Sequence, residues 1–191
     1  MLKVLLVDQS AKRSMPLKQT LTEVGYEVVG RISDSADLNL AVAKLQPDVI
    51  VMDVDSPSRD TLEHIVVSGM DTPRPIVMFT HDGEPEKIRS ATQAGVSAYV
   101  VGGLESARIR PIVDAAIARF EEYRLVKQEL HDMTLKLSER KNVERAKGVL
   151  MHRKQLSEQE AYTLMRKMAM DKNIKLADLA QQIVDAATLL L

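Results

Sequence analysis

Five short apolar runs, separated by stretches with helical periodicity, fill the first half of this 191-residue chain. The runs are rich in β-branched residues, and we predict strands at 2–7, 27–30, 49–52, 76–79 and 98–101. Between them we expect helices at 14–24, 35–45, 59–67 and 85–94, the first and last of which are followed by a glycine. This alternation predicts an α/β fold in which helices cover both faces of a parallel sheet.

Polar residues close three of the predicted strands. Asp8 follows the first strand, Asp53 the third and Thr80 the fourth. One Asp after a strand is commonly a turn or helix cap. The carboxyl ends of parallel strands, however, lie along one edge of the sheet, where ligands and chemistry gather. We therefore predict an acidic pocket at this edge.

The pattern resembles a response-regulator receiver domain, whose fold is a five-stranded parallel, flavodoxin-like sheet. The resemblance implies that Asp53 occupies the phospho-acceptor position and that Asp8 belongs to an acidic pair that holds Mg²⁺. It also places Asp55 where a backbone carbonyl would meet the metal, Thr80 as the switch hydroxyl and Tyr99 as the rotating aromatic.

Two positions depart from the receiver pattern. Gln9 stands where a second acid is expected, and Gly102-Gly103 replace a Lys-Pro pair whose lysine would meet the phosphoryl group. An amide is a poorer Mg²⁺ ligand than a carboxylate, and the missing lysine removes a charge that would stabilise phosphoryl transfer. We expect weak or absent phosphorylation of Asp53, a degenerate Mg²⁺ site at Asp8, Asp53 and Asp55, no other metal or cofactor, and no catalytic residue.

A long helical pattern runs from Arg108 to Lys154. Because proline is tolerated in the first turn of a helix, Pro111 predicts a start near residue 109 or 110. A 3-4-3-4 stripe flanked by Glu and Lys then predicts a coiled-coil seam: Tyr123, Val126, Leu130, Met133 and Leu137. The stripe could instead pack on the body of the same chain, but the length of the helix favours a homodimer through residues 123–137.

A capping box at Ser157 and Glu160 divides the last third of the chain into helices. On a helical wheel, the side of the first helix away from its apolar face carries Lys141, Arg145, Gly148 and His152. The second helix likewise presents Tyr162, Arg166 and Met170, away from an apolar stripe of Ala161, Leu164, Met165 and Met168.

The charge of the chain is unevenly distributed. Residues 138–175 hold ten Lys and Arg against five Asp and Glu, a local charge of +5 that leaves −6 for the remainder. A basic patch on an acidic body is typical of a polyanion binder. Lys and Arg neutralise phosphates, and Tyr and Arg planes stack on unpaired bases. A merely solvated helix face is the alternative, but a Tyr and a Met on the polar side of an amphipathic helix favour a binding surface.

The residues in this region also match a known pattern. R-x-x-x-E-x-A-K-G-x-L-M begins at Arg140, E-A-Y-x-L-M-R-x-x-A-M begins at Glu160, and a helix rich in Leu and Ala follows at 175–191. This arrangement resembles the ANTAR domain, a family of RNA-binding antiterminators. The resemblance adds Lys147 to the expected RNA-binding residues. Over its whole length the chain is most similar to the antiterminators of nitrate assimilation. This implies leader RNA hairpins and a nitrate- or nitrite-sensing inhibitory protein as partners.

We therefore predict a receiver-like domain at 1–120, a coiled-coil linker at 121–137 and an ANTAR domain at 138–191. A DNA-binding response regulator with a helix-turn-helix and a protein-interaction module without nucleic acid remain alternatives. The last helix carries Lys175 at its start and no Arg, whereas the last helix of a helix-turn-helix protein usually reads DNA. An enzyme is not expected, because the sequence shows no nucleophile–base pair, and the absence of cysteine and of long apolar runs fits a cytoplasmic protein.

Overall fold

The computed structural model describes residues 1–9, 11–34, 36–102 and 106–188. The chain divides into two compact units, Met1–Arg124 and Leu125–Leu191, and each is described by itself.

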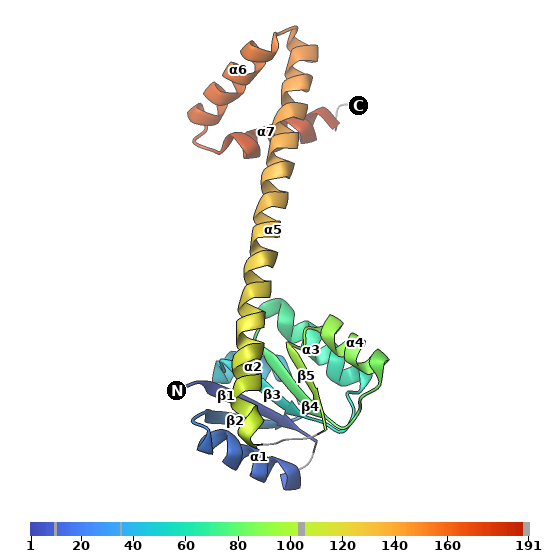
Figure 1. Ribbon diagram of the computed structural model, residues 1–191. Helices are drawn as coiled ribbons and strands as arrows, with labels where there is room; N and C mark the ends of the chain where they lie inside the picture. Colours follow the sequence, from blue (N-terminus) through green and yellow to red (C-terminus); the bar gives the residue numbers. More distant parts are fainter. Residues whose placement is uncertain (10, 35, 103–105, 189–191) are drawn as a thin grey trace. The chain divides into compact units, whose positions relative to one another are not determined.

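The first unit is built on a five-stranded sheet (Figure 1). Its strands are β1 (Lys3–Asp8), β2 (Glu27–Ser33), β3 (Val49–Asp53), β4 (Ile76–Thr80) and β5 (Ala98–Val101). They lie in the order β2-β1-β3-β4-β5, and every neighbouring pair is parallel. All five residues of β4 are buried, which explains why the central strands read as continuous apolar runs. The predicted fold class is confirmed.

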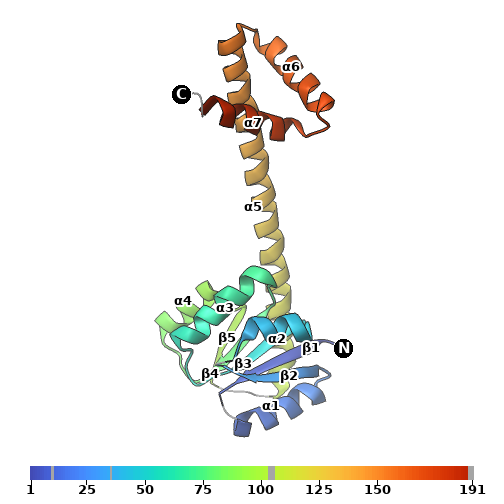
Figure 2. The same ribbon diagram turned by 180° about the vertical axis from the view of Figure 1, so that it is seen from behind.

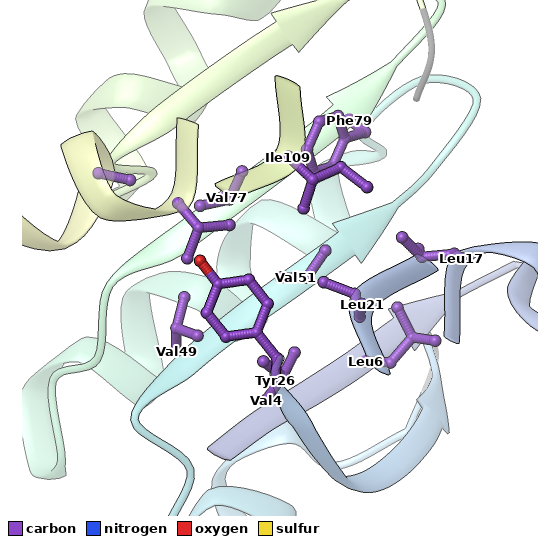
Figure 3. Packing of buried hydrophobic residues seen from close by; sticks show 12 residues of the cluster. Val4, Leu6, Leu17, Leu21, Tyr26, Val49, Val51, Val77, Phe79 and Ile109 are labelled. Atoms are coloured by element: carbon purple, nitrogen blue, oxygen red, sulfur yellow. The ribbon is translucent and has the colours of Figure 1, made fainter. Parts of the chain in front are cut away.

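Helices cover both faces of this sheet (Figures 1 and 2). On one face, α1 (Ala11–Glu23) and the first turns of α5 (Ser106–Lys154) enclose a core that includes Leu17, Leu21, Ile109 and Val113. Figure 3 shows the Tyr26 ring within this core, close to Val49 and Leu21. On the other face lie α2 (Leu38–Leu45), α3 (Arg59–Asp71) and α4 (Pro85–Ala94).

Helix α5 begins three residues before the earliest start that Pro111 predicted. Proline cannot donate a hydrogen bond to the carbonyl of Ala107, and inside a helix it costs about 3 kcal/mol. Ile109 and Val113, on either side of the proline, are both completely buried against the sheet. Their burial offsets the lost hydrogen bond, so packing overrides the local preference at this helix start.

The second unit contains the C-terminal part of α5, α6 (Glu158–Asp171) and α7 (Leu176–Thr188). Its small core is formed by Ala146, Leu150, Ala161, Met165, Ala169, Leu179 and Ala180. The predicted capping box is present at the start of α6: the Glu160 amide donates to the Ser157 hydroxyl, and the Ser157 amide donates to a Glu160 carboxylate oxygen at 2.9 Å. Hydrogen bonds that the Ser157 hydroxyl and then the Ser157 amide donate to the Glu160 carboxylate lower the pKa of Glu160.

The predicted seam on the middle of α5 lies at the surface. Each of its five apolar residues is between 58 and 69% exposed: Tyr123, Val126, Leu130, Met133 and Leu137. Single exposed apolar side chains are ordinary, but a stripe of five at heptad spacing is not. Along the described residues, no helix is both long and apolar enough to cross a membrane.

Candidate nucleic-acid interface and receiver pocket

The basic strip predicted on α5 faces solvent. Lys141, Arg145, Gly148 and His152 are not part of the core of the second unit, whereas Ala146 and Leu150 on the opposite side are buried in it. The helical wheel therefore placed the strip correctly, because α5 uses its apolar side to pack against α6 and α7.

The polar side of α6 is arranged in the same way. Tyr162 is 36% exposed and Met170 74%, and Arg166 is exposed as well. Ala161, Met165 and Ala169 fill the core from the opposite side of the helix. A tyrosine ring, a guanidinium and a thioether thus stand in solvent, and none of them is needed to fill the core of this unit.

Gly148 is unusual among the residues of the strip. A Cβ atom built on it would meet no neighbouring atom within 4 Å. Glycine inside a helix costs about 1 kcal/mol relative to alanine, and packing within this unit gives no reason for that cost. A bare backbone at this point does allow a ligand to come close to the helix.

The structure places Lys147 in an ion pair and not, as predicted, free to contact phosphate. Its Nζ lies 2.8 Å from a carboxylate oxygen of Glu144 and 2.7 Å from one of Glu158, and the side chain is only 10% exposed. Hydrogen bonds to Glu144 and then Glu158 raise the pKa of Lys147, and Lys147 lowers the pKa of Glu158. The structure thus uses Lys147 to join α5 to α6. The helical wheel had placed it beside the core, and only the family pattern marked it as a contact.

The described part of α7 contributes no cation to the surface. Its residues 176–188 include no Lys or Arg, and it is tied to α5 by the Asn142 side chain, which donates to Gln181 Oε1 at 2.5 Å. Apart from Lys172 and Lys175 in the turn between α6 and α7, the positive charge of this unit therefore lies on α5 and α6, as the sequence predicted.

The receiver residues gather at the carboxyl ends of the strands. Asp8 and Asp53 are direct neighbours across the β1–β3 pair, and Thr80 ends β4 on the far side of β3. Asp8 and Thr80 are each only 2% exposed. The prediction that these side chains share one edge of the sheet is confirmed.

Arg31 is a member of this pocket that the sequence analysis missed. Its Nε donates to Asp8 Oδ2 at 2.5 Å and its Nη2 donates to Asp8 Oδ1 at 2.8 Å. The hydrogen bond to Asp8 raises the pKa of the guanidinium. We predicted that the second strand ends at Gly30, whereas β2 continues to Ser33 and brings Arg31 beside Leu6 of β1, on the same side of that strand as Asp8.

Gln9 also has two partners within the pocket. Its Nε2 donates to Asp34 Oδ2 at 2.9 Å, and its Oε1 accepts a hydrogen bond from the Asp55 amide at 3.1 Å. A carboxylate at this position could accept from the amide but could not donate to Asp34. The amide therefore suits the arrangement that the structure shows.

Thr80 and Tyr99 are both bound to nearby backbone. The Thr80 hydroxyl donates to the Asp55 carbonyl at 2.7 Å and accepts from the Asp82 amide at 3.1 Å. The Tyr99 hydroxyl donates to the Asp82 carbonyl at 2.8 Å, and burial raises its pKa. A continuous series of hydrogen bonds thus links the loop after β3 to Tyr99 on β5.

The residues present do not fit an Mg²⁺ ion. Arg31 covers both carboxylate oxygens of Asp8, and the Asp55 carbonyl accepts from Thr80 and from the His81 amide at 3.3 Å. Over the described ranges, no group of three or more Asp, Glu or His is arranged to hold a metal. Gly102 has a φ of +102°, a left-handed value that favours glycine over lysine; Gly103 lies outside the described residues.

Comparison with protein-family models decides the classification. The model of the response regulator receiver domain matches residues 4–114, which is more than half of the chain. The chain belongs to the response regulator receiver family. The model of the ANTAR domain matches residues 131–184, so the protein is an ANTAR-domain response regulator. That match begins inside the segment predicted as a linker.

Individual proteins are similar to all or part of this chain. The transcriptional regulatory protein PdtaR of Mycobacterium tuberculosis is 29% identical over 183 residues, covering 96% of this chain and 89% of PdtaR. A protein-glutamate methylesterase/protein-glutamine glutaminase of Hahella chejuensis is 38% identical over 103 residues, but only 28% of that protein is covered. The structure of chemotaxis protein CheY4 of Vibrio cholerae matches with a TM-score of 0.54 at 26% identity, covering 61% of this chain and 98% of CheY4.

Proposed function

We propose that this ANTAR-domain response regulator is a transcription antiterminator that binds hairpin loops in nascent leader RNA and prevents the terminator from forming. The observation that carries the proposal is the surface of the second unit. Basic side chains on α5, beside a glycine with open space, and Tyr162, Arg166 and Met170 on α6 are exposed to solvent, while the described part of α7 offers no cation.

Within this proposal each residue of the binding surface on α5 and α6 has a chemical role. Lys141, Arg145 and His152 contact phosphates, and Tyr162 and Arg166 stack on or hydrogen-bond to splayed loop bases. Gly148 lets the RNA approach the α5 backbone, and Met170 packs against a base. Lys147 acts indirectly, because it fixes the angle at which α6 leaves α5.

Dimerisation is part of the same proposal. A second copy of α5 would cover the exposed seam from Tyr123 to Leu137 and place two RNA-binding units in one particle. Two linked sites would hold a leader with two hairpins more tightly than one site could, because the second binding event becomes intramolecular.

The finer biological role rests on resemblance. The similarity to the nitrate-assimilation antiterminator NasT suggests a cytoplasmic protein controlled by a nitrate- or nitrite-sensing inhibitory partner rather than by a kinase. The pocket supports this proposal, because Gln9 and Arg31 leave little place for the metal that assists phosphorylation.

Binding to leader RNA hairpins and to promoter duplex at matched salt tests the proposal. We expect RNA to bind more tightly, and we expect Arg166→Ala to reduce discrimination between loop sequences. Lys167→Ala is the matched control, since it removes the same charge from an exposed neighbouring position on α6. Preference for duplex DNA would favour a helix-turn-helix regulator, and no binding to either nucleic acid would favour a protein-interaction module.

A further inference from the structure

The acidic edge of the receiver sheet contains its own cation. Asp8 and Asp53 end adjacent strands, Asp34 and Asp55 follow in the next loops, and the guanidinium of Arg31 meets Asp8. Two carboxylates on neighbouring strands are about 5 Å apart at the backbone, a separation at which like charges repel. A positive charge at this edge stabilises the arrangement.

The geometry of the Arg31–Asp8 pair is that of a specific ion pair and not of an incidental surface contact. Both N–H···O distances are short, at 2.5 and 2.8 Å, and they form the two-pronged contact for which guanidinium and carboxylate are matched. Asp8 is 2% exposed while the Arg31 side chain is 40% exposed, so the arginine closes the solvent side of the carboxylate. Arginine also keeps its charge at every physiological pH.

Gln9 lowers the negative charge of the same pocket. In the hollow of about 450 Å³ that Asp8, Gln9, Arg31, Ile32 and Ser33 line, a neutral amide replaces what would be another negative charge. Its two ends bond to Asp34 and to the Asp55 amide. Gln9 is neutral where the receiver pattern has an acid, and Arg31 adds one positive charge; together they balance the charge that a divalent ion would otherwise balance.

We propose that Arg31 is a built-in cation that occupies the metal-binding carboxylate of this receiver pocket, so that the pocket folds without a divalent ion and excludes one. Arg31 thereby becomes the residue that decides whether this receiver takes metal. The proposal rests on the pocket alone and makes no use of RNA binding.

Removing Arg31 should have two effects that removing one partner of an ordinary surface ion pair would not have. Loss of the guanidinium leaves a buried carboxylate without its partner, which lowers stability. It also uncovers both oxygens of Asp8, so a divalent cation can then take the place of the guanidinium. The same change should therefore weaken the metal-free protein and create metal binding.

The experiment uses the full chain as wild type, Arg31→Gln and Arg31→Lys. Arg59→Gln is the control, because Arg59 donates to Glu63 at 2.8 Å on the exposed surface of α3 and does not line the hollow at Asp8. Thermal melting with EDTA or millimolar Mg²⁺, and Mn²⁺ binding followed by electron paramagnetic resonance, are measured for each protein.

We expect the melting temperature of wild type and Arg59→Gln to be the same with and without Mg²⁺. Arg31→Gln should melt lower in EDTA, recover part of the loss with Mg²⁺, and bind Mn²⁺ at least about tenfold more tightly than wild type. Arg31→Lys keeps the charge but cannot form the two-pronged contact. Its melting temperature and its Mn²⁺ affinity should lie between those of wild type and Arg31→Gln.

Metal binding by wild type that equals or exceeds that of the Arg31 variants would overturn the proposal. Arg31→Gln that gains no metal affinity would overturn it as well. If Arg31→Gln does not fold, Arg31→Lys and the response of wild type to Mg²⁺ decide the question in the same way.

Discussion

Lys147 of α5 and Glu158 of α6 are joined by a hydrogen bond of 2.7 Å across the turn between the two helices, and Glu144 holds the same Nζ from the other side at 2.8 Å. Because the lysine is nearly buried, this contact sets the direction of α6. It therefore positions Tyr162 and Arg166 without itself touching a ligand.

Replacing Lys147 with Met should lower the melting temperature of the protein and remove part of its sensitivity to acid. Glu158 has a lowered pKa in the folded protein, so its contribution is complete above the ordinary glutamate pKa and is lost as pH falls through the folded value. Melting curves between neutral pH and pH about 3 should show a smaller decline in the variant than in wild type. An equal decline in both proteins would show that the pair adds nothing.

Replacing Gly148 with Ala should separate stability from binding. The change should raise the free energy of unfolding by about 0.5–1 kcal/mol, because alanine is the better helix former and has free space here. It should also weaken hairpin RNA binding by roughly tenfold, or about 1.4 kcal/mol, since the methyl group stands where RNA approaches.

Gly69→Ala is the matched control for this prediction. Gly69 is a glycine inside α3 that also has nothing within 4 Å of an added Cβ. It should gain similar stability with no change in RNA affinity. Unaltered RNA binding by Gly148→Ala would show that the open glycine is not part of the interface.

Replacing Leu130 with Glu should prevent self-association through α5. Leu130 lies at the centre of the seam and is 64% exposed, so a charge there is tolerated by a monomer but not inside a coiled coil. Sedimentation equilibrium should give a dimer for wild type and a monomer for the variant. Leu40→Glu, on α2 and 66% exposed, is the control and should remain dimeric. A monomeric wild type would contradict the proposed dimer.

Tyr26 should make stability fall at alkaline pH. Burial raises the pKa of Tyr26 from 10.0 to about 12, and the negative charge of Asp114 acts in the same direction. Asp114 accepts a hydrogen bond from the Tyr26 hydroxyl at 3.3 Å. The folded protein holds this proton more tightly than the unfolded chain. The contribution is therefore complete below pH 10 and is lost as pH rises through 12. Urea unfolding of Tyr26→Phe over this range should show a smaller decline than that of wild type.

The sheet and the presence of its helices were predictable because each strand forms a separate apolar run, whereas the helix predicted at 59–67 continues to Asp71. The solvent side of the C-terminal helices was predictable for the same reason, since a period of 3.6 residues assigns Arg145 and Ala146 to different environments. These features depend on local pattern, which a sequence displays directly.

The missed features depend on partners far apart in the chain. Arg31 meets Asp8 only because β2 continues past Gly30, and a lone arginine after a short strand gives no signal of that contact. Lys147 was expected to contact phosphate from the family pattern alone, and its partner Glu158 comes from another helix. The early start of α5 at Ser106 depends on the burial of Ile109 against the sheet.

The central claim, that the solvent side of α5 and α6 binds leader RNA, is tested most directly by the salt dependence of hairpin binding. Lys141→Ala/Arg145→Ala should weaken binding and reduce the slope of log K against log salt by about 0.7 for each phosphate that is no longer neutralised. Lys18→Ala/Lys44→Ala, which removes two exposed cations from α1 and α2, should leave affinity and slope unchanged. Equal affinities and slopes for the two double variants would contradict the account.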